Sequence, residues 1–313
     1  MVKPILLIVF NRPDLTLKVL NEIKNVSPSK LYIAVDGPRE KVLEDKNKCL
    51  EVLKIVKNIA WDCEVHFLIQ EHNLGCSMGP RKALEWFFLH EESGIILEDD
   101  CLPSKGFFLF CSELLDYYKN EEKIINICGS NMGDNKIGSS GYFFSRFMNM
   151  SGWATWRRSV NLIDYDLNDW KNSRRSLYSV YEVFRQHFFD TDIGWYNYWK
   201  HKFDLTTEYE NVTWWDWQWI YYQINNKKFT IIPNKNLVSN IGFNEQATHT
   251  KDSANRLANI PLQAMHFPLQ HPLIIKPDFK YEEYFVKWVW CYHKRTIFSN
   301  WLKQKLIKLF KSK

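Results

Sequence analysis

The sequence contains no apolar run long enough to cross a membrane and has little glycine or proline. Its apolar start, residues 5–10, ends at Asn11 and Arg12, well short of the roughly 20 residues that a membrane helix requires. No small-residue cleavage site follows, so we expect no targeting segment. With 12 Gly and 11 Pro in 313 residues, collagen-like and low-complexity classes are excluded. The 45% of hydrophobic residues predicts a soluble globular chain with a large core.

The cysteine patterns of zinc sites and of disulfide frameworks are also missing. The seven cysteines are an odd number, with no CxxC pair and no Cys/His spacing typical of zinc. Reduced thiols are the simplest explanation, which favours a cytoplasmic protein. The residues concerned are Cys49, Cys63, Cys76, Cys101, Cys111, Cys128 and Cys291.

An excess of positive charge is absent from most of the chain. There are 41 Lys and Arg against 36 Asp and Glu, a net charge of +5. Residues 287–313 hold eight of the basic residues and no acidic one, so 41 minus 8 leaves 33 basic against 36 acidic residues elsewhere. We therefore expect no nucleic-acid partner for the body of the protein, and an anionic surface as partner of its C-terminal end.

The same end has the pattern of a basic amphipathic helix over residues 301–311. Leu302, Leu306, Leu309 and Phe310 share one face, and lysines occupy another. Two interpretations stay open: a helix docked on its own domain, or a helix lying on an anionic membrane. The second predicts a cytoplasmic protein that is peripheral on the inner face of the cell membrane, within reach of a lipid-linked glycan.

The first part of the chain alternates short apolar runs with longer amphipathic segments. This is the pattern of β-α units, so an α/β fold with a mostly parallel, Rossmann-like sheet flanked by helices is predicted. Residues 141–243 are instead rich in Trp and Tyr, and no linker marks a domain boundary before about residue 250. We expect strands at 5–10, 31–35, 64–69, 94–97 and 124–128 and helices at 13–25, 42–59, 79–90 and 107–118.

Three consecutive carboxylates, Glu98-Asp99-Asp100, follow the apolar strand at 94–97. Ligands of open α/β sheets bind outside the carboxyl ends of the strands, so this triplet is placed where a ligand would bind. Adjacent acids repel one another, and a hard divalent cation with diphosphate oxygens would relieve that repulsion. The alternative is an acidic loop that caps the next helix near Lys105.

Two further strands deliver polar side chains to the same edge. Arg12 follows the first strand and can pair with a phosphate, and Asp36 follows the second and can accept from a base or a ribose hydroxyl. Each is alternatively a helix cap or a turn residue. GxGxxG and GxxxxGK[ST] motifs are absent, which counts against a dinucleotide or P-loop site. Together with the triplet, the residues outline a pocket for a nucleotide diphosphate.

These motifs resemble glycosyltransferases of the GT-A fold, within the inverting branch of the N-acetylglucosaminyltransferase that initiates complex N-glycans and its bacterial relatives. They occur in the family's order over roughly residues 3 to 250. The matching segments are Ile8-Val9-Phe10-Asn11-Arg12, Ala34-Val35-Asp36-Gly37, Asn73-Leu74-Gly75 with Arg81-Lys82-Ala83-Leu84, Ile96-Leu97-Glu98-Asp99-Asp100, Ser151-Gly152-Trp153 and Trp215-Asp216-Trp217.

The resemblance implies a role for each matching residue. Asp100 would bind Mn²⁺ or Mg²⁺, and Glu98 and Asp99 would approach the ribose of a nucleotide-sugar donor, with UDP favoured. Asp36 resembles the acid that reads the base, and Arg12 the basic residue beside it. Other cofactor-binding positions implied in this way are Arg81, Gly152 and Trp153, and His249 would contact phosphate or metal.

The resemblance also implies a division of the chain. Residues 1–250 would form the GT-A domain, with 1–130 binding the nucleotide and 131–250 serving acceptor binding and catalysis. Residues 251–313 would be a C-terminal extension.

Asp216 is the candidate catalytic base. The resemblance places it there, and its neighbours Trp214, Trp215 and Trp217 would raise the pKa of the Asp216 carboxyl by removing water, which suits a group that accepts a proton. The alternative is an aromatic helix packed on the sheet, with Asp216 paired to a neighbour. The 16% of aromatic residues fits an acceptor cleft, since sugar rings stack on Trp and Tyr, and fits a large core equally well.

The sequence thus predicts a metal-dependent inverting glycosyltransferase that moves a hexose or an N-acetylhexosamine from a nucleotide-diphosphate sugar to a glycan or lipid-linked saccharide. A sugar-phosphate nucleotidyltransferase would use the same carboxylates and metal, although it usually carries a Gly-rich phosphate loop near its start. A non-catalytic glycan-binding protein would explain the tryptophans and leave the triplet without a purpose.

Overall fold

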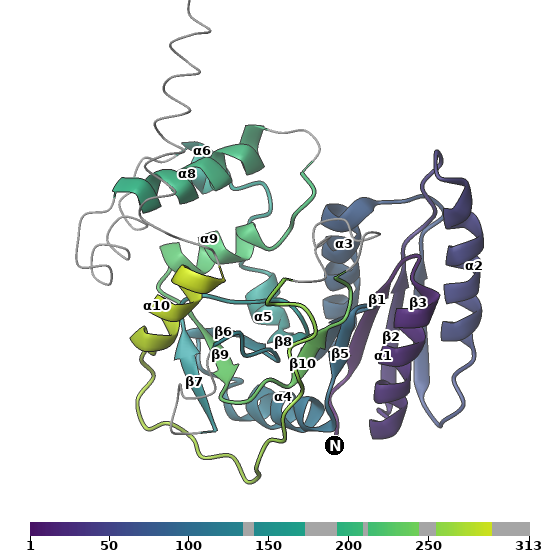
Figure 1. Cartoon of the computed structure of the whole chain (residues 1–313), viewed down its shortest axis with the longest axis horizontal. Coiled ribbons are helices and arrows are strands. Elements are labelled where there is room, and N and C mark those ends of the chain that lie inside the picture. Colours follow the sequence, from purple (N-terminus) through teal and green to yellow (C-terminus); the bar gives the residue numbers. More distant parts are fainter. Residues whose placement is uncertain (134–140, 173–192, 209–211, 244–254, 290–313) are drawn as a thin grey trace, which may run out of the picture.

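The computed structural model describes residues 1–133, 141–172, 193–208, 212–243 and 255–289 (Figure 1). Within these ranges an eight-stranded sheet has the order β3-β2-β1-β4-β8-β6-β9-β7, and β5 pairs with β10 in a separate ribbon. The strands are β1 Ile5–Val9, β2 Lys30–Val35, β3 Glu64–Ile69, β4 Ser93–Glu98, β5 Cys101–Pro103, β6 Ile124–Cys128, β7 Tyr142–Ser145, β8 Trp153–Trp156, β9 Phe229–Pro233 and β10 Val238–Asn240.

The central sheet is mostly parallel, which confirms the predicted α/β class. Strands β1 to β4 are mutually parallel, and β6 and β9 run in the same direction. Only β8, inserted between β4 and β6, and the edge strand β7 run against them among the described strands. The carboxyl ends of β1, β2 and β4 therefore meet at one edge of the sheet.

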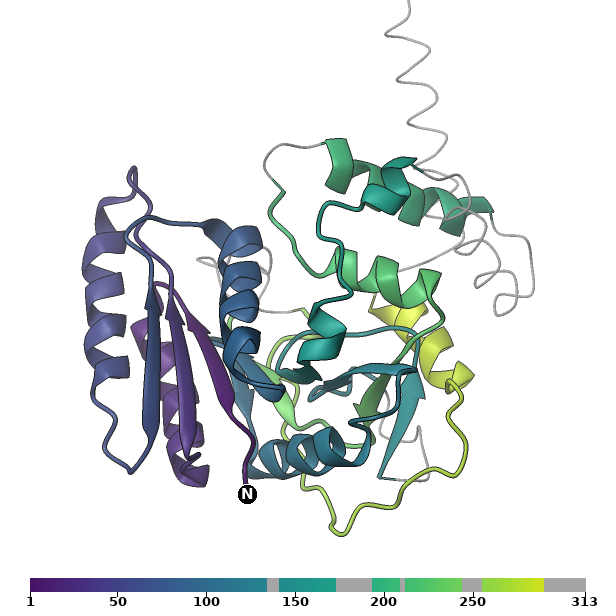
Figure 2. The same ribbon diagram turned by 180° about the vertical axis from the view of Figure 1, so that it is seen from behind.

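Helices cover both faces of this sheet (Figure 1 and Figure 2). Alternate residues of β1 divide between two cores: Leu7 packs with α1, α2 and α4, whereas Leu6 packs with α3, α9 and α10. In both views α6 and α8 lie beyond α9, away from the sheet. The helices are α1 Pro13–Val26, α2 Leu43–Lys57, α3 Gly75–His90, α4 Lys105–Tyr117, α5 Arg157–Val160, α6 Asn168–Asn172, α8 Ile193–Glu208, α9 Trp217–Asn225 and α10 Phe279–Trp288.

Local signals explain where several elements begin. Pro13 opens α1, where its missing N–H costs nothing. The Ser104 hydroxyl accepts a hydrogen bond from the Phe107 amide at 3.3 Å and so caps α4, which means that the helix is not capped by the acidic triplet. Helix α3 begins at Gly75, earlier than the predicted residue 79. The short strands β7 to β10 were not among the predicted elements.

The described part of the C-terminal segment packs on the sheet. Tyr281 and Phe285 of α10 are buried in the core, and the Asp278 amide donates to the Phe144 carbonyl of β7 at 2.8 Å. Buried Glu282 pairs with buried Arg146, which follows β7. Residues 290–313, with the predicted basic helix, lie outside the described residues, and within those residues no helix is long and apolar enough to cross a membrane.

Candidate functional site

The acidic triplet lies at the carboxyl end of β4, beside Arg12. Glu98 is the last residue of β4, and Asp99 and Asp100 form the turn into β5. The Arg12 guanidinium, at the start of α1, donates to Asp100 Oδ2 at 3.0 Å and lies 3.7 Å from Asp99 Oδ1. The Phe10 amide donates to Asp99 Oδ2 at 3.3 Å. The structure thus brings together four of the residues that the sequence singled out.

Burial and mutual repulsion make Glu98 and Asp99 hard to ionise. The pKa of Glu98 is raised, first by burial and then by the charges of Asp100, Asp99 and Asp216, with Arg12 acting against them. The pKa of Asp99 is also raised, by burial and then by Asp100. Three carboxyl groups face a single guanidinium, so a cation bound here would remove repulsion and stabilise all three charges.

The donor set suits a hard divalent cation. Carboxylate oxygens are the ligands that Mg²⁺ and Mn²⁺ prefer. No group of three or more His, Cys, Asp or Glu side chains in the described part of the chain could hold a metal by itself. A cation at this site would therefore be held by one or two carboxylates, Asp100 foremost, and would complete its coordination with ligand oxygens and water. His249, the other predicted metal contact, lies outside the described residues.

The segment after β10 covers Asp100. The Ile241 amide donates to the Asp100 carbonyl at 2.9 Å. Gly242 is so close that a Cβ built on it would lie 2.6 Å from the Asp100 Cβ, nearer than real carbon atoms approach. Only glycine fits there without a shift, so the chain at 241–243 is pressed against the proposed cation ligand.

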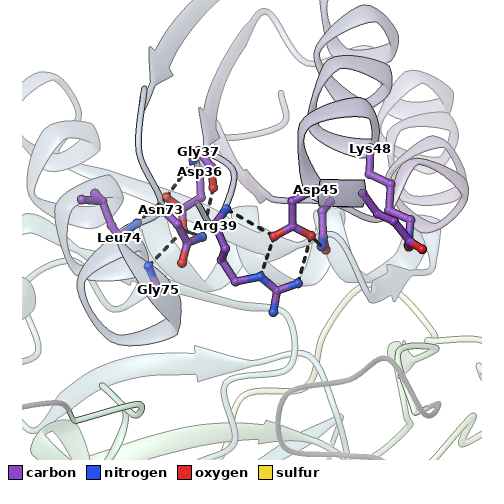
Figure 3. A network of polar contacts seen from close by, with 10 residues as sticks. Asp36, Gly37, Arg39, Asp45, Lys48, Asn73, Leu74 and Gly75 are labelled. Carbon is purple, nitrogen blue, oxygen red and sulfur yellow. Dashed lines mark hydrogen bonds and ion pairs between the residues drawn. The ribbon is translucent and has the colours of Figure 1, made fainter. Parts of the chain in front are cut away.

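Asp36 fastens α3 to the end of β2 (Figure 3). Its Oδ1 accepts from the amides of Gly37 and Leu74, and its Oδ2 from the amide of Gly75 and the side chain of Asn73, all between 2.8 and 3.1 Å. A carboxylate has about four acceptor sites, and these donors use them. Asp36 thus positions residues 73–75, and its expected contact with a base stays a prediction.

The sequence interpretation missed Arg39, which lies beside this network (Figure 3). Its guanidinium donates to both oxygens of buried Asp45, at 2.5 and 2.9 Å, and lies 5.4 Å from the centre of the Phe10 ring. The Asn11 side chain donates to the same carboxylate at 2.7 Å. The Gly37-Pro38 turn signalled a loop at a strand end, and the next basic residue, Arg39, could have been found from it.

A cavity of about 210 Å³ opens among these residues, which we call the donor cavity. Its walls come from the ends of β1, β2, β3 and β4 and from the first turn of α3. Glu98, Asp99, Asp36 and Arg39 are its charged lining residues, and Phe10 contributes an aromatic surface. The cavity therefore combines apolar and charged groups, which suits a nucleotide.

Asp216 comes from the distant aromatic region and acts on the same cluster. It precedes α9, and its negative charge is one of those that raise the pKa of Glu98. Asp216 also lines a cavity of about 140 Å³ with Lys202 and Trp217. The Lys202 ammonium lies 4.2 Å from the centre of the Trp217 ring, and burial lowers the pKa of Lys202 although Asp216 acts to raise it. A carboxylate, an ammonium and an indole thus line one small cavity, and the carboxylate acts electrostatically on Glu98.

Three predicted positions lie away from the donor cavity or beneath it. Arg81 points from α3 toward Tyr165, 4.8 Å from the centre of that ring, and pairs with Glu85 at 2.9 Å. Trp153 is 1% exposed, so its ring packs in the core and offers no surface to a ligand. Gly152 has φ +66°, and a Cβ there would lie 2.8 Å from Val238, so it allows the chain to pass close to β10.

Comparisons with known proteins do not assign the chain to a family. No protein-family model and no curated protein sequence matches it. HddC from Yersinia pseudotuberculosis complexed with GMP-PN is a similar solved structure, with 6% identity, a TM-score of 0.32, and coverage of 50% of this chain and 77% of HddC. A UDP-glucose pyrophosphorylase complexed with UDP-glucose is another similar solved structure, with 11% identity, a TM-score of 0.29, and coverage of 51% of this chain and 71% of the pyrophosphorylase. Likenesses this distant carry no argument about activity.

Proposed function

We propose that this protein is an inverting glycosyltransferase that moves a sugar from a nucleotide-diphosphate donor to a hydroxyl group of a saccharide. One observation carries the proposal. Glu98 and Asp99 line a cavity at the sheet edge, and the charge of Asp216, more than 110 residues further along the chain, acts on Glu98 and raises its pKa. A binding protein would have no need for carboxyl groups that are as hard to ionise as Glu98 and Asp99.

In this proposal the donor cavity holds the nucleotide. The Phe10 ring and the Arg39 guanidinium present flat surfaces on which a base can stack. Arg12 lies where it can pair with a phosphate, and its present partners are Asp99 and Asp100. Asp100 would hold Mn²⁺ or Mg²⁺, which when bound neutralises the charge of the diphosphate leaving group.

Asp216 is the proposed general base. It accepts the proton of the acceptor hydroxyl, and that oxygen forms a bond to the anomeric carbon of the donor sugar. The bond from this carbon to the diphosphate oxygen breaks at the same time, and the electron pair leaves with the nucleoside diphosphate. A single displacement of this kind inverts the anomeric centre. Lys202 lines the same cavity as Asp216, and the two groups attract each other electrostatically.

The acceptor class and the location in the cell stay predictions. A glycan or a lipid-linked saccharide is the proposed acceptor. Attachment of residues 287–313 to an anionic membrane rests on their composition, eight basic residues with no acidic one.

A donor-turnover assay tests the proposal. The full chain is incubated with Mn²⁺ and UDP-, GDP- or dTDP-sugars, and release of the nucleoside diphosphate is measured. Asp216→Asn should reduce turnover by about 10²- to 10⁴-fold, the usual contribution of a general base. Asp116→Asn, at an exposed carboxylate paired with Lys3, should not change it. Normal turnover by Asp216→Asn would remove the base assignment. Pyrophosphate formed from a nucleoside triphosphate and a sugar 1-phosphate would indicate a nucleotidyltransferase instead.

A further inference from the structure

The first turn of α3 is bonded to the segment that carries Asp216, and the mechanism above gives these bonds no role. The Ser77 hydroxyl donates to the Trp214 carbonyl at 3.1 Å, and the Cys76 thiol donates to the Thr213 carbonyl at 3.0 Å. The partners of each bond are 137 residues apart in the chain, so the bonds join distant segments. Asp216 follows Trp214 by two residues. Two side chains of α3 therefore hold the backbone just before the proposed base.

The α3 end of this link is itself tied to the sheet. Asp36, directly after β2, accepts hydrogen bonds from the amides of Leu74 and Gly75 at 2.8 and 3.1 Å (Figure 3). Cys76 and Ser77 are the next two residues, so their side chains start from a backbone that Asp36 holds in place. Cys76 also lines the donor cavity. The first turn of α3 thus borders the donor cavity and bonds to the segment of the base.

Both side chains carry the hydrogen that these bonds require. Only a protonated thiol can donate a hydrogen bond. Burial raises the pKa of the Cys76 thiol, and the charges of Glu98 and Asp36 act in the same direction, so the thiol keeps its hydrogen at neutral pH. The Ser77 hydroxyl carries a hydrogen at any pH of interest. The link therefore exists under the conditions of a turnover assay.

Helix α8 holds the same segment through its aromatic side chains. The Trp214 indole donates to Thr206 Oγ1 at 2.8 Å, and its ring stacks on Trp217 with the ring centres 4.2 Å apart. Lys202 of α8 lies over the Trp217 ring. Trp214 and Trp217 flank Asp216, so these contacts limit the positions that its backbone can take. Loss of the α3 bonds would therefore loosen the segment without releasing it.

We infer that Ser77 and Cys76 are positioning residues, which hold the Asp216 carboxylate in place relative to the donor cavity. A general base acts only within hydrogen-bond reach of the proton that it accepts. A displacement of about 1 Å can lower a rate by about 10²-fold. The effect on turnover rests on the proposed function; the positioning of residues 213–217 by α3 does not.

Ser77→Ala tests the inference, because it removes one of the two bonds and leaves Cys76 and the donor cavity unchanged. Donor turnover is measured on the full chain with Mn²⁺ and UDP-, GDP- or dTDP-sugars, and kcat and the KM for the donor are determined separately. We expect kcat to fall about 10- to 100-fold with an unchanged KM, since the base moves and the donor contacts stay. Ser77→Thr keeps the hydroxyl group and should keep most of the kcat.

Hydrogen exchange gives a readout that does not depend on turnover. Residues 213–219 span the segment before α9 and the first residues of this helix. Mass spectrometry of peptides from this segment should show faster amide exchange in Ser77→Ala than in the unmodified chain, because a segment that loses a tether opens more often. Exchange in Ser77→Thr should match that of the unmodified chain.

Ser27→Ala is the matched control. The Ser27 hydroxyl donates to the Lys24 carbonyl at 2.8 Å at the end of α1, so this variant also loses a bond from a hydroxyl to a backbone carbonyl. It should change neither kcat nor exchange over residues 213–219. Melting curves of all variants report folding. If Ser77→Ala does not fold, exchange in Cys76→Ala, compared with Cys76→Ser, decides the question.

Two results would overturn the inference: an unchanged kcat of Ser77→Ala in a chain that turns the donor over, or unchanged exchange over residues 213–219. An equal loss of kcat in Ser77→Thr would also contradict it, because that variant keeps the hydroxyl group. Faster exchange in Ser77→Ala without donor turnover by the unmodified chain would contradict the proposed function and leave the positioning of residues 213–217 by α3 in place. Donor turnover that Ser77→Ala keeps in full, with unchanged exchange, would do the reverse.

Discussion

Residues 1–118 and residues 124–289 form their parts of the sheet in different ways. In the first region, strands and helices alternate along the chain, and β1 pairs with both β2 and β4. In the second, the strand order β8-β6-β9-β7 does not follow the chain, and α10 returns to pack beside β7. The first region is therefore held by contacts between neighbouring β-α units, and the second by contacts between distant segments.

The proposed chemistry lies where the two regions meet. The first region provides Arg12 and the triplet, and the second provides Asp216 and the cover over Asp100 at Gly242. Binding of the donor should depend chiefly on the first region, and turnover on both. The following changes test this division.

The largest effect on stability should come from the buried ion pair of the second region. Arg146 is 5% exposed and Glu282 1%, and the guanidinium contacts both carboxylate oxygens. Arg146→Met leaves a buried carboxylate with no cation, so the free energy of unfolding should fall by about 3–5 kcal/mol. Urea denaturation measures this change.

Lys3→Met is the control for that variant. Its ion pair with Asp116 is exposed, so its loss should cost less than about 1 kcal/mol. Equal effects of the two substitutions would show that the second region does not depend on the buried pair.

Gly242→Ala should have a smaller effect, at the junction of the regions. The added methyl group would lie 2.6 Å from the Asp100 Cβ, so one of the two segments must move. We expect a loss of about 1–3 kcal/mol of unfolding free energy, with weaker binding of nucleotide and Mn²⁺. Gly106→Ala is the matched control, because its new Cβ would have no neighbour closer than 3.4 Å. Unchanged nucleotide binding in Gly242→Ala would show that the cover does not position Asp100.

The smallest effect concerns pH and the first region. Glu98 and Asp99 titrate near pH 4 when unfolded, and burial raises both pKa values in the folded protein. Between these values the folded protein binds more protons than the unfolded chain, so the free energy of unfolding falls as pH rises. Glu98→Gln removes one such group and should reduce that fall by about 1 kcal/mol between about pH 5 and pH 8.

Thermal or urea denaturation across this pH range measures the difference. Glu51→Gln, at an exposed position of α2, should keep the pH dependence of the unmodified protein. If Glu98→Gln showed the same pH dependence as the unmodified protein, burial would not raise the pKa of the Glu98 carboxyl group.

The fold of the first region could be predicted because its periodicity is local. Strand β3 has the predicted bounds, and α1 ends within one residue of its predicted end. Strands β7 and β8 have only four residues each, fully buried, so they show no alternation that separates a strand from any other apolar run. The pairing of β8 between β4 and β6 is a long-range contact that no local pattern reports.

The part of the site that lies at the ends of strands could be predicted from the sequence. Arg12 and the triplet follow strands that lie side by side, so their meeting follows from topology. The role of Asp36 in holding α3 required knowledge of where residues 73–75 lie, and the cation–π contact of Arg39 with Phe10 depends on the loop after β2. Trp153 was expected at a ligand because Ser151-Gly152-Trp153 matches a motif of the family that the sequence resembles, whereas its ring packs in the core against Trp215 and Trp219.

Thermal melting with nucleotide sugars tests the central claim most directly. The unmodified chain, Asp100→Asn and Asp216→Asn are each melted with UDP-, GDP- and dTDP-sugars, with and without Mn²⁺, since a ligand of the native state raises the midpoint. We predict a metal-dependent shift with one nucleotide class that Asp216→Asn keeps and Asp100→Asn loses. No shift with any donor, or a shift that Asp100→Asn keeps in full, would contradict the account.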